Sequence, residues 1–231
     1  MKILVLSDTH LTDEFDQALC DYISDLVKSV DKVILNGDIW DGYVTSFDSF
    51  VTSKWQQLFA LFKEKQAVYI YGNHDRQEMA DDRVSEFSTQ QTLQHSFIEG
   101  EKRFHVEHGH LIAPELDDRH PTLISIFTPL APLFFRLLAK RTMFNRVINW
   151  AFIDPRQKKL DQIMCKYAKN QLQTLADIVI FGHSHTFHKT ISREIYWNSG
   201  CVEYTNLSYL LITDGVVTPV TAQYSKDLRI V

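Results

Sequence analysis

Short runs of apolar residues that stop abruptly at polar ones recur along this chain. Runs of this length, bounded by turn-forming residues, are typical of strands buried on both faces. Four of them predict strands, at residues 2–7, 32–36, 67–71 and 177–181. Between the first three, residues 15–30 and 47–65 repeat apolar positions with a helical period and predict helices. This alternation predicts an α/β fold with a largely parallel sheet, in which ligands bind at the carboxyl ends of the strands.

The pattern changes in the second half of the chain. Residues 115–175 contain no convincing strand but much helical-period apolar content, and they predict a helical insertion. After residue 181, short strands are expected at residues 189–191, 194–197 and 207–213, with Asp214-Gly215 as a hairpin turn. These strands favour a second sheet, mixed or antiparallel. A chain of 231 residues, 45% of them hydrophobic, fits a single domain over residues 1–231.

Charge and cysteine content narrow the class of protein. A net charge of -5 argues against generic electrostatic binding to nucleic acid, so no nucleic-acid partner is expected. Cys20, Cys165 and Cys201 form no CxxC pair, and one is left over in any disulfide scheme, which fits a reducing cytosol. The apolar run near the N-terminus is too short for an export signal, and the run at residues 122–138 is interrupted by prolines and an arginine. We therefore expect a cytoplasmic protein.

Five short segments carry side chains that bind metals. Their residues are carboxylates and imidazoles with one amide, which suit borderline divalent ions. Any one of them alone could be an ordinary turn. Four directly follow predicted strands, and all five together favour one site at which these side chains converge. The segments are Asp8-Thr9-His10, Gly37-Asp38-Ile39-Trp40-Asp41, Gly72-Asn73-His74-Asp75, His108-Gly109-His110 and Gly182-His183-Ser184-His185.

In this order the five segments resemble the signature of the calcineurin-like metallophosphoesterase family. The resemblance implies a four-layer αββα sandwich, here with residues 115–175 as a helical cap insertion within it. It also implies two divalent ions that share Asp38. One ion would be held by Asp8, His10, Asp38 and His185, and the other by Asp38, Asn73, His108 and His183.

The same resemblance assigns catalytic roles. His74 would face the substrate and Asp75 would fix the orientation of its ring. Asp41 either forms a hydrogen bond to a ligand imidazole or serves as a simple cap. A hydroxide shared by the two ions would attack phosphorus, so no nucleophilic side chain is needed. Manganese is the favoured metal, with iron, zinc and cobalt as alternatives. The other histidines are interpreted as surface or core residues: His95, His105, His110, His120 and His188.

Within the family, the chain is most similar to the UDP-2,3-diacylglucosamine pyrophosphatase group of lipid A synthesis. The similarity lies in residues 34–41, in residues 196–200 and in the helical insertion, which would match a lipid-binding lid. By this resemblance Asn198 would bind substrate. The chain departs from that group at His74 and His110, where the group has arginine and aspartate.

The distribution of charge supports an anionic or amphiphilic substrate. Residues 122–170 hold nine Lys and Arg against two Asp, so this segment carries +7 and the rest of the chain -12. A basic, apolar helical segment favours peripheral contact with the inner face of the cytoplasmic membrane, although a helix pair with a solvated basic face is an alternative. A soluble nucleotide phosphodiesterase or phosphoprotein phosphatase is the alternative enzyme. A non-catalytic scaffold and a nuclease are less favoured, and the oligomeric state stays open.

Overall fold

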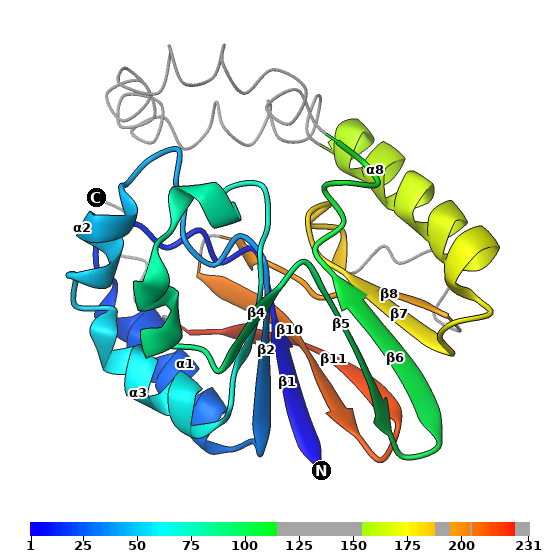
Figure 1. Ribbon diagram of the computed structural model, residues 1–231, viewed down its shortest axis with the longest axis horizontal. Helices are drawn as coiled ribbons and strands as arrows, with labels where there is room; N and C mark the ends of the chain where they lie inside the picture. The colour runs from blue at the N-terminus through cyan, green and yellow to red at the C-terminus, as the bar shows by residue number, and fades with distance from the viewer. Residues whose placement is uncertain (115–153, 188–194, 204, 225–231) are drawn as a thin grey trace.

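Two β-sheets and their covering helices make up the part of the chain that the computed structural model describes, residues 1–114, 154–187, 195–203 and 205–224 (Figure 1). The seven-stranded first sheet has the order β11-β10-β1-β2-β3-β4, with β9 paired to β10. Its strands are β1 (Lys2–Leu6), β2 (Lys32–Asn36), β3 (Val68–Ile70), β4 (Gln90–Thr92), β9 (Val202–Glu203), β10 (Asn206–Thr213) and β11 (Val216–Gln223). The four-stranded second sheet has the order β5-β6-β7-β8. Its strands are β5 (Gln94–Glu99), β6 (Lys102–Glu107), β7 (Ile178–Phe181) and β8 (Tyr196–Asn198).

The parallel core of the first sheet follows the sequence prediction. β1, β2, β3 and β4 pair in parallel, in register from Ile3 opposite Lys32 onward. All four predicted strands are confirmed, as β1, β2, β3 and β7. The first predicted helix is also confirmed as α1 (Gln17–Lys28), whose start is capped by Asp16 accepting a hydrogen bond from the Leu19 amide.

A single helix over residues 47–65 was expected, and this prediction is wrong. The segment forms α2 (Phe47–Val51) and α3 (Gln56–Glu64). Ser53 Oγ donates to the Phe50 carbonyl oxygen, and the Trp55 indole donates to the carbonyl oxygen of Thr12 at 2.8 Å. The Ser53 hydroxyl bonds to a backbone carbonyl at the end of α2, which favours termination of that helix. The buried Trp55 side chain holds the start of α3 against the backbone of Thr12. Two short 3-10 helices follow β3, at Gln77–Met79 and Asp82–Glu86.

The C-terminal strands divide between the two sheets, which corrects the prediction that they form a second sheet together. β8 joins the second sheet, whereas β10 pairs antiparallel with β1, from Lys2 opposite Thr213. The Asp214-Gly215 turn, with positive φ at both residues, leads into β11 as predicted. The strand expected at residues 189–191 lies outside the described residues. The β5–β6 hairpin, which turns at Gly100, was not predicted.

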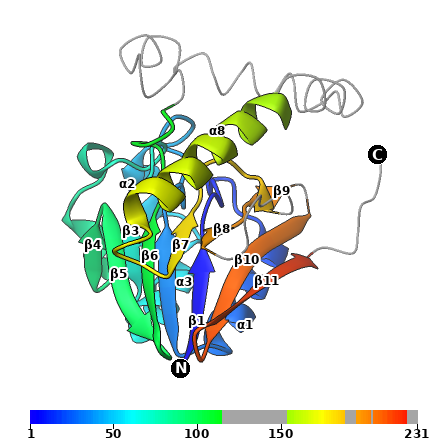
Figure 2. The ribbon, with the colours of Figure 1, turned by 90° about the vertical axis from the view of Figure 1, so that its right-hand side faces the viewer.

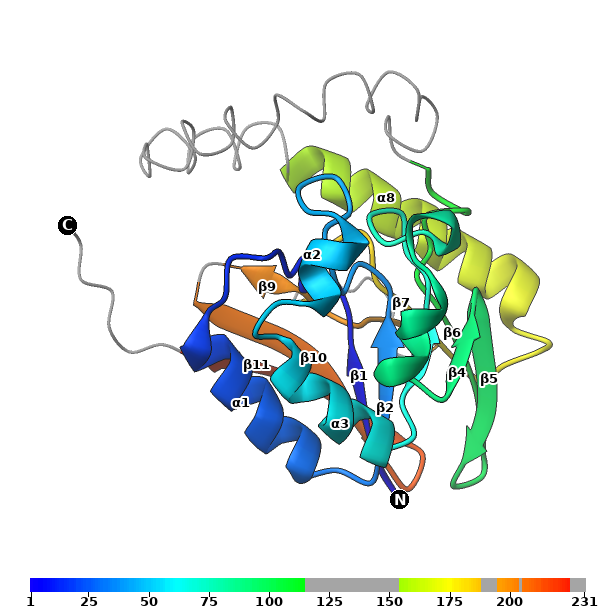
Figure 3. The ribbon, with the colours of Figure 1, turned by 60° about the vertical axis from the view of Figure 1, so that its left-hand side comes forward.

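Three hydrophobic clusters show that the described elements form four layers. Leu4 and Leu6 pack with α1 and α3 on one face of the first sheet, and Ile3 and Val5 face the second sheet. The third cluster lies between the outer face of the second sheet and α8 (Asp154–Tyr167), where Met164 packs with residues of β7 and β8. Figure 2 shows α8 lying across the second sheet, and Figure 3 shows α1 and α3 side by side over the first. The αββα prediction is thereby confirmed.

The described part of the predicted helical insertion is this outer helix. α8 continues into a π-helical turn at Ala168–Leu172, and Leu160, Met164 and Leu172 are buried as their spacing indicates. Residues 115–153 lie outside the described residues, so a cap stays a prediction. Among the described helices, none has the length and apolar character needed to cross a membrane. All three cysteines are buried and unpaired.

Candidate metal centre

The five metal-binding segments meet because each follows a strand at its carboxyl end. Those strands are β1, β2, β3, β6 and β7, and Figure 1 shows β1 and β6 running toward the same end of the molecule. Close approach of their loops requires glycine at two positions. A Cβ at Gly72 would lie 2.2 Å from Asp38 Oδ1, and one at Gly37 would lie 2.4 Å from His108 Nδ1. Any side chain there would displace a predicted ligand.

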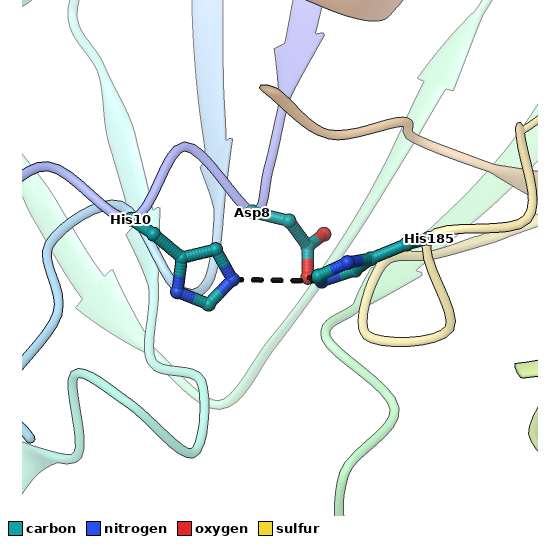
Figure 4. A group of neighbouring side chains, drawn as sticks. All are labelled: Asp8, His10 and His185. Carbon is teal, nitrogen blue, oxygen red and sulfur yellow. Dashed lines mark hydrogen bonds and ion pairs between the residues drawn. The ribbon is translucent and has the colours of Figure 1, made fainter. Parts of the chain in front are cut away.

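One group of predicted ligands comes from β1 and β7. His185 Nε2 lies 3.0 Å from Asp8 Oδ1 and 3.5 Å from His10 Nε2. Figure 4 shows the His10 and His185 rings pointing toward each other beside the Asp8 carboxylate. Two basic ring nitrogens that face each other across a carboxylate oxygen form a natural cradle for a cation. Asp8, His10 and His185 all offer ligand atoms within 4.8 Å of one another.

The second group lies around Asp38. His108 Nε2 is 3.2 Å from Asp38 Oδ2 and 3.2 Å from Asn73 Oδ1, and Asp38, His108 and His183 again lie within ligand distance. His108 Nδ1 donates to the carbonyl oxygen of Asn36, so Nε2 is left to bind a metal. His183 Nε2 lies 3.0 Å from the Ala113 carbonyl oxygen and donates to it, which leaves Nδ1 for the ion.

Asp38 lies between the two groups. Its Oδ2 is 3.2 Å from His108 Nε2 in one group and 3.9 Å from His10 Nε2 in the other. The carboxylate is only 2% exposed. The structure thus brings together all seven predicted ligands in the arrangement that a shared carboxylate requires, and their nitrogen and oxygen donors fit a pair of first-row divalent ions. The binding of each residue to an ion stays a prediction.

The ligands sit on strained backbone. A positive φ is uncommon outside glycine and costs about 1–3 kcal/mol per residue. Such strain persists only where the surrounding structure enforces it, and it concentrates at functional sites. Five of the seven predicted ligands have a left-handed φ: Asp8 (52°), His10 (45°), Asp38 (53°), His183 (63°) and His185 (53°).

Opposite charges balance at the site. Burial alone would raise the pKa of Asp38, but the nearby His108 and His74 hold the pKa of this carboxyl well below its usual range. Burial would lower the pKa of His108, whereas the charge and hydrogen bond of Asp38 raise it to about 10. His10 and His183 behave in the opposite way, because burial lowers the pKa of each to about 4. These two rings are therefore neutral and ready to bind a metal at neutral pH.

These pKa values predict that metal binding releases protons. A ligand imidazole must be neutral, and His108, with a pKa of about 10 in the metal-free protein, is protonated at pH 7.5. Adding Mn²⁺ at that pH should release about one proton from this residue, and apparent affinity should rise roughly tenfold per pH unit until pH approaches that pKa. Calorimetry in buffers of different ionisation enthalpy measures the proton count. An affinity that is independent of pH between 6.5 and 8.5 would contradict this linkage.

The side chains around His74 differ from the prediction. Asp75 was expected to orient the His74 ring, but its carboxylate instead accepts hydrogen bonds from the Asp38, Ile39 and Gly72 amides and from the Tyr69 hydroxyl. Asp75 is fully buried and shapes the loop that carries Asp38. The carboxylate beside His74 is that of Asp41, whose Oδ1 lies 3.0 Å from His74 Nδ1. Asp41 Oδ2 lies 3.8 Å from His10 Nδ1, which is too long for a hydrogen bond, whereas Asp41 Oδ1 accepts from the Tyr43 amide at 3.0 Å, as the capping alternative predicts.

Asn198 is also placed differently from the prediction. Its side chain is 1% exposed, its amide donates to the Gly182 carbonyl oxygen and to Ser184 Oγ, and its Oδ1 accepts from the Gly200 amide. Every polar atom of this amide therefore has a protein partner. The prediction that Asn198 contacts substrate is corrected: its side chain supports the segment that carries His183 and His185.

Other residues around the centre had no predicted role there, and His110 was interpreted only as a surface or core residue. His110 is buried, with its ring centroid 5.5 Å from that of His108, and burial together with the charge of His108 lowers its pKa to about 3. Its proximity to His108 in the chain was the only signal. Arg76 Nη2 donates to the Tyr43 hydroxyl, and the Tyr43 ring lies against that of His74. No motif marks either Tyr43 or Arg76.

A four-layer α/β sandwich whose strand ends gather two sets of nitrogen and oxygen ligands defines a class of metal-dependent hydrolase. A family profile described as calcineurin-like phosphoesterase matches residues 1–187. The chain belongs to this family, and it is a metal-dependent phosphoesterase of the dinuclear type. A search of curated proteins finds no match to it.

Solved structures with similar folds were also found. Vps29 of Entamoeba histolytica in complex with Zn²⁺ is 14% identical with a TM-score of 0.47, over 97% of this chain and 100% of that one. A novel archaeal phosphodiesterase is 15% identical with a TM-score of 0.48, over 96% and 100%. YfcE, a phosphoesterase from E. coli, is 12% identical with a TM-score of 0.46, over 97% and 100%.

Proposed function

We propose that this phosphoesterase hydrolyses a phosphodiester or pyrophosphate bond in a UDP-linked glycolipid such as UDP-2,3-diacylglucosamine. Two divalent ions, manganese first, would serve as cofactors. The observation that carries the hydrolytic part is the convergence of two ligand groups around one buried carboxylate, Asp38. Two ions a few ångströms apart, when bound, polarise phosphoryl oxygens and lower the pKa of water.

The side chains of the protein would position the proton donor and supply the proton for the leaving group. Asp41 Oδ1 accepts the hydrogen of His74 Nδ1, so the proton for the leaving oxygen would come from Nε2 of the imidazolium form, which becomes neutral imidazole once that proton is given. The His74 amide donates to Asp38 Oδ1 at 2.8 Å. This bond ties the His74 backbone to the shared carboxylate and so limits the distance between the proton donor and the metal ligands.

Support for the lipid-linked substrate comes from charge and sequence. Residues 34–41 and 196–200 resemble those of the UDP-2,3-diacylglucosamine pyrophosphatase group, and residues 122–138 form a strongly apolar run. A basic surface beside apolar residues favours the headgroups of an anionic membrane, and we propose that the enzyme works at the inner face of the cytoplasmic membrane. The exposed basic residues of the described outer helix and its following turn are Arg156, Lys158, Lys159, Lys166 and Lys169.

A substrate panel with Mn²⁺ tests this proposal. We expect kcat/KM for a UDP-linked glycolipid in mixed micelles to exceed that for nucleotides and for a phosphoprotein by roughly tenfold or more, because only the lipid substrate engages the basic and apolar segment. If nucleotides or phosphoproteins are the better substrates, the soluble alternative replaces the lipid proposal. Absence of turnover on every phosphoester, with metal bound, would contradict hydrolysis itself.

Sedimentation with anionic liposomes tests the membrane part separately. Recovery should be high at low salt and fall as salt screens the basic surface. Lys158→Gln with Lys159→Gln should weaken recovery, whereas Lys28→Gln with Lys54→Gln, which removes two exposed charges from the opposite helical layer, should not. Protein that stays in the supernatant at every salt concentration contradicts membrane contact.

A further inference from the structure

A buried carboxylate lies behind the loop that carries His183 and His185. Asp161, on α8, is 1% exposed, and its Oδ1 accepts hydrogen bonds from Thr186 Oγ1 at 2.7 Å and from the Tyr196 hydroxyl at 2.6 Å. Within the described part of the chain, no Lys or Arg forms an ion pair with it. A carboxylate in such a place is held by hydroxyl donors alone, so its position depends on them.

Hydrogen bonds connect Asp161 to that loop. Thr186 Oγ1 donates to Asp161 and lies 2.8 Å from Ser184 Oγ, and Ser184 also forms a side-chain hydrogen bond with Asp161. Ser184 Oγ in turn accepts from the Asn198 amide at 3.0 Å. A continuous chain of hydrogen bonds therefore runs from Asn198 through Ser184 and Thr186 to Asp161, and each member supports the next.

These hydrogen bonds hold both sequence neighbours of His185. Ser184 and Thr186 flank that histidine, and Ser184 directly follows His183. Both histidines have a left-handed backbone, with φ of 63° and 53°, which relaxes unless neighbouring contacts prevent it. The loop also offers one histidine to each ligand group, so its relaxation would disturb both.

We infer that Asp161 is a positioning residue of the metal centre: through Thr186 and Ser184 it holds the strained His183–His185 loop in the shape that presents a ligand to each ion. The inference rests on the proposed use of the centre to bind two ions. It also gives α8 a role besides covering the second sheet, because the helix carries the carboxylate on which the hydrogen-bond chain ends.

Thr186→Val tests this role with little change in volume. It removes the hydroxyl between Ser184 and Asp161, and we expect Mn²⁺ affinity, measured by titration calorimetry, to fall roughly tenfold for the loss of one hydrogen bond to a charged group. Co²⁺ in place of Mn²⁺ should show an altered visible absorption spectrum, because the ligand geometry changes. Thr186→Ser keeps the hydroxyl and should restore affinity to within about twofold of the wild type.

Tyr196→Phe is the matched control. It removes the other hydrogen bond to the same Asp161 oxygen, from β8, and leaves the Thr186 hydroxyl in place between Ser184 and Asp161. We expect a lower melting temperature with Mn²⁺ affinity within about twofold of the wild type. Unchanged affinity in Thr186→Val, or an equal loss in Tyr196→Phe, overturns the positioning role while leaving the metal centre intact. A wild-type protein that binds no divalent ion overturns the proposed centre as well.

Discussion

Asp38→Asn is expected to remove both metal ions and to lower kcat/KM by about a thousandfold or more, because two ions together supply several kcal/mol of charge stabilisation. Asp38 Oδ2 faces both ligand groups, at 3.2 Å from His108 Nε2 and 3.9 Å from His10 Nε2. Asparagine keeps the shape of the side chain but has one oxygen and no charge. Elemental analysis of the purified variant counts the ions, and steady-state kinetics with added Mn²⁺ measure the loss of rate.

A matched control separates the site from the fold. Asp31→Asn makes the same chemical change at the opposite end of β2, where the carboxylate accepts the Lys2 amide at an exposed position. This variant should keep two ions and full activity. If Asp38→Asn still holds two equivalents of metal, the shared carboxylate is wrong. Loss of only one equivalent would assign Asp38 to a single ion.

The convergence of the predicted ligands at one place could be expected from the sequence for a physical reason. The strands that precede four of the five segments are buried on both faces, so they appear as uninterrupted apolar runs, and each ends where a polar loop begins. Parallel strands bring such loops to one edge of a sheet, whatever the length of the intervening helices. The position of a ligand residue just after a strand can thus be read from the local pattern of apolar and polar residues.

The predictions that failed concern residues and strands whose partners are determined by tertiary contacts. Asp75 is next to His74 in the chain, yet its carboxylate binds three loop amides and the Tyr69 hydroxyl, which only the packed sheet brings together. Asn198 begins an Asn-Ser-Gly sequence that is typical of an exposed turn, but its side chain is buried. β10 comes soon after β8, a strand of the second sheet, and only its pairing with β1 decides where it belongs. The spacing of residues along the chain predicts none of these contacts.

The β5–β6 hairpin was missed because its pattern is weak. β5 alternates exposed and partly buried residues before its buried last residue, and the first two residues of β6 are exposed. An edge hairpin with one open face lacks the apolar run that marked the central strands. The strand that precedes His108 was therefore not expected, although the histidine itself was assigned correctly to the cluster.

His74→Ala should keep both ions and lower kcat by about a hundredfold to ten-thousandfold, the usual contribution of a general acid. The expectation rests on the contact between His74 Nδ1 and Asp41 Oδ1, by which Nε2 is assigned to the leaving oxygen. Because Asp41 contacts His74 and its charge lies close to His10, Asp41→Asn should lower the rate by a smaller factor, about ten to a hundredfold, with weaker metal binding.

The leaving group distinguishes proton donation from mere contact with the phosphoryl group. A nitrophenolate departs without a proton, whereas an alkoxide needs one, so the loss of rate in His74→Ala should be much larger for an alkyl ester than for a nitrophenyl ester. His95→Ala, a change of the same type on β5, controls for the removal of an imidazole and should leave both rates unchanged. An equal loss with both esters would assign His74 to stabilising the phosphoryl oxygens. Loss of metal from His74→Ala would instead make this histidine a ligand, and the proton donor would have to be another group beside the centre.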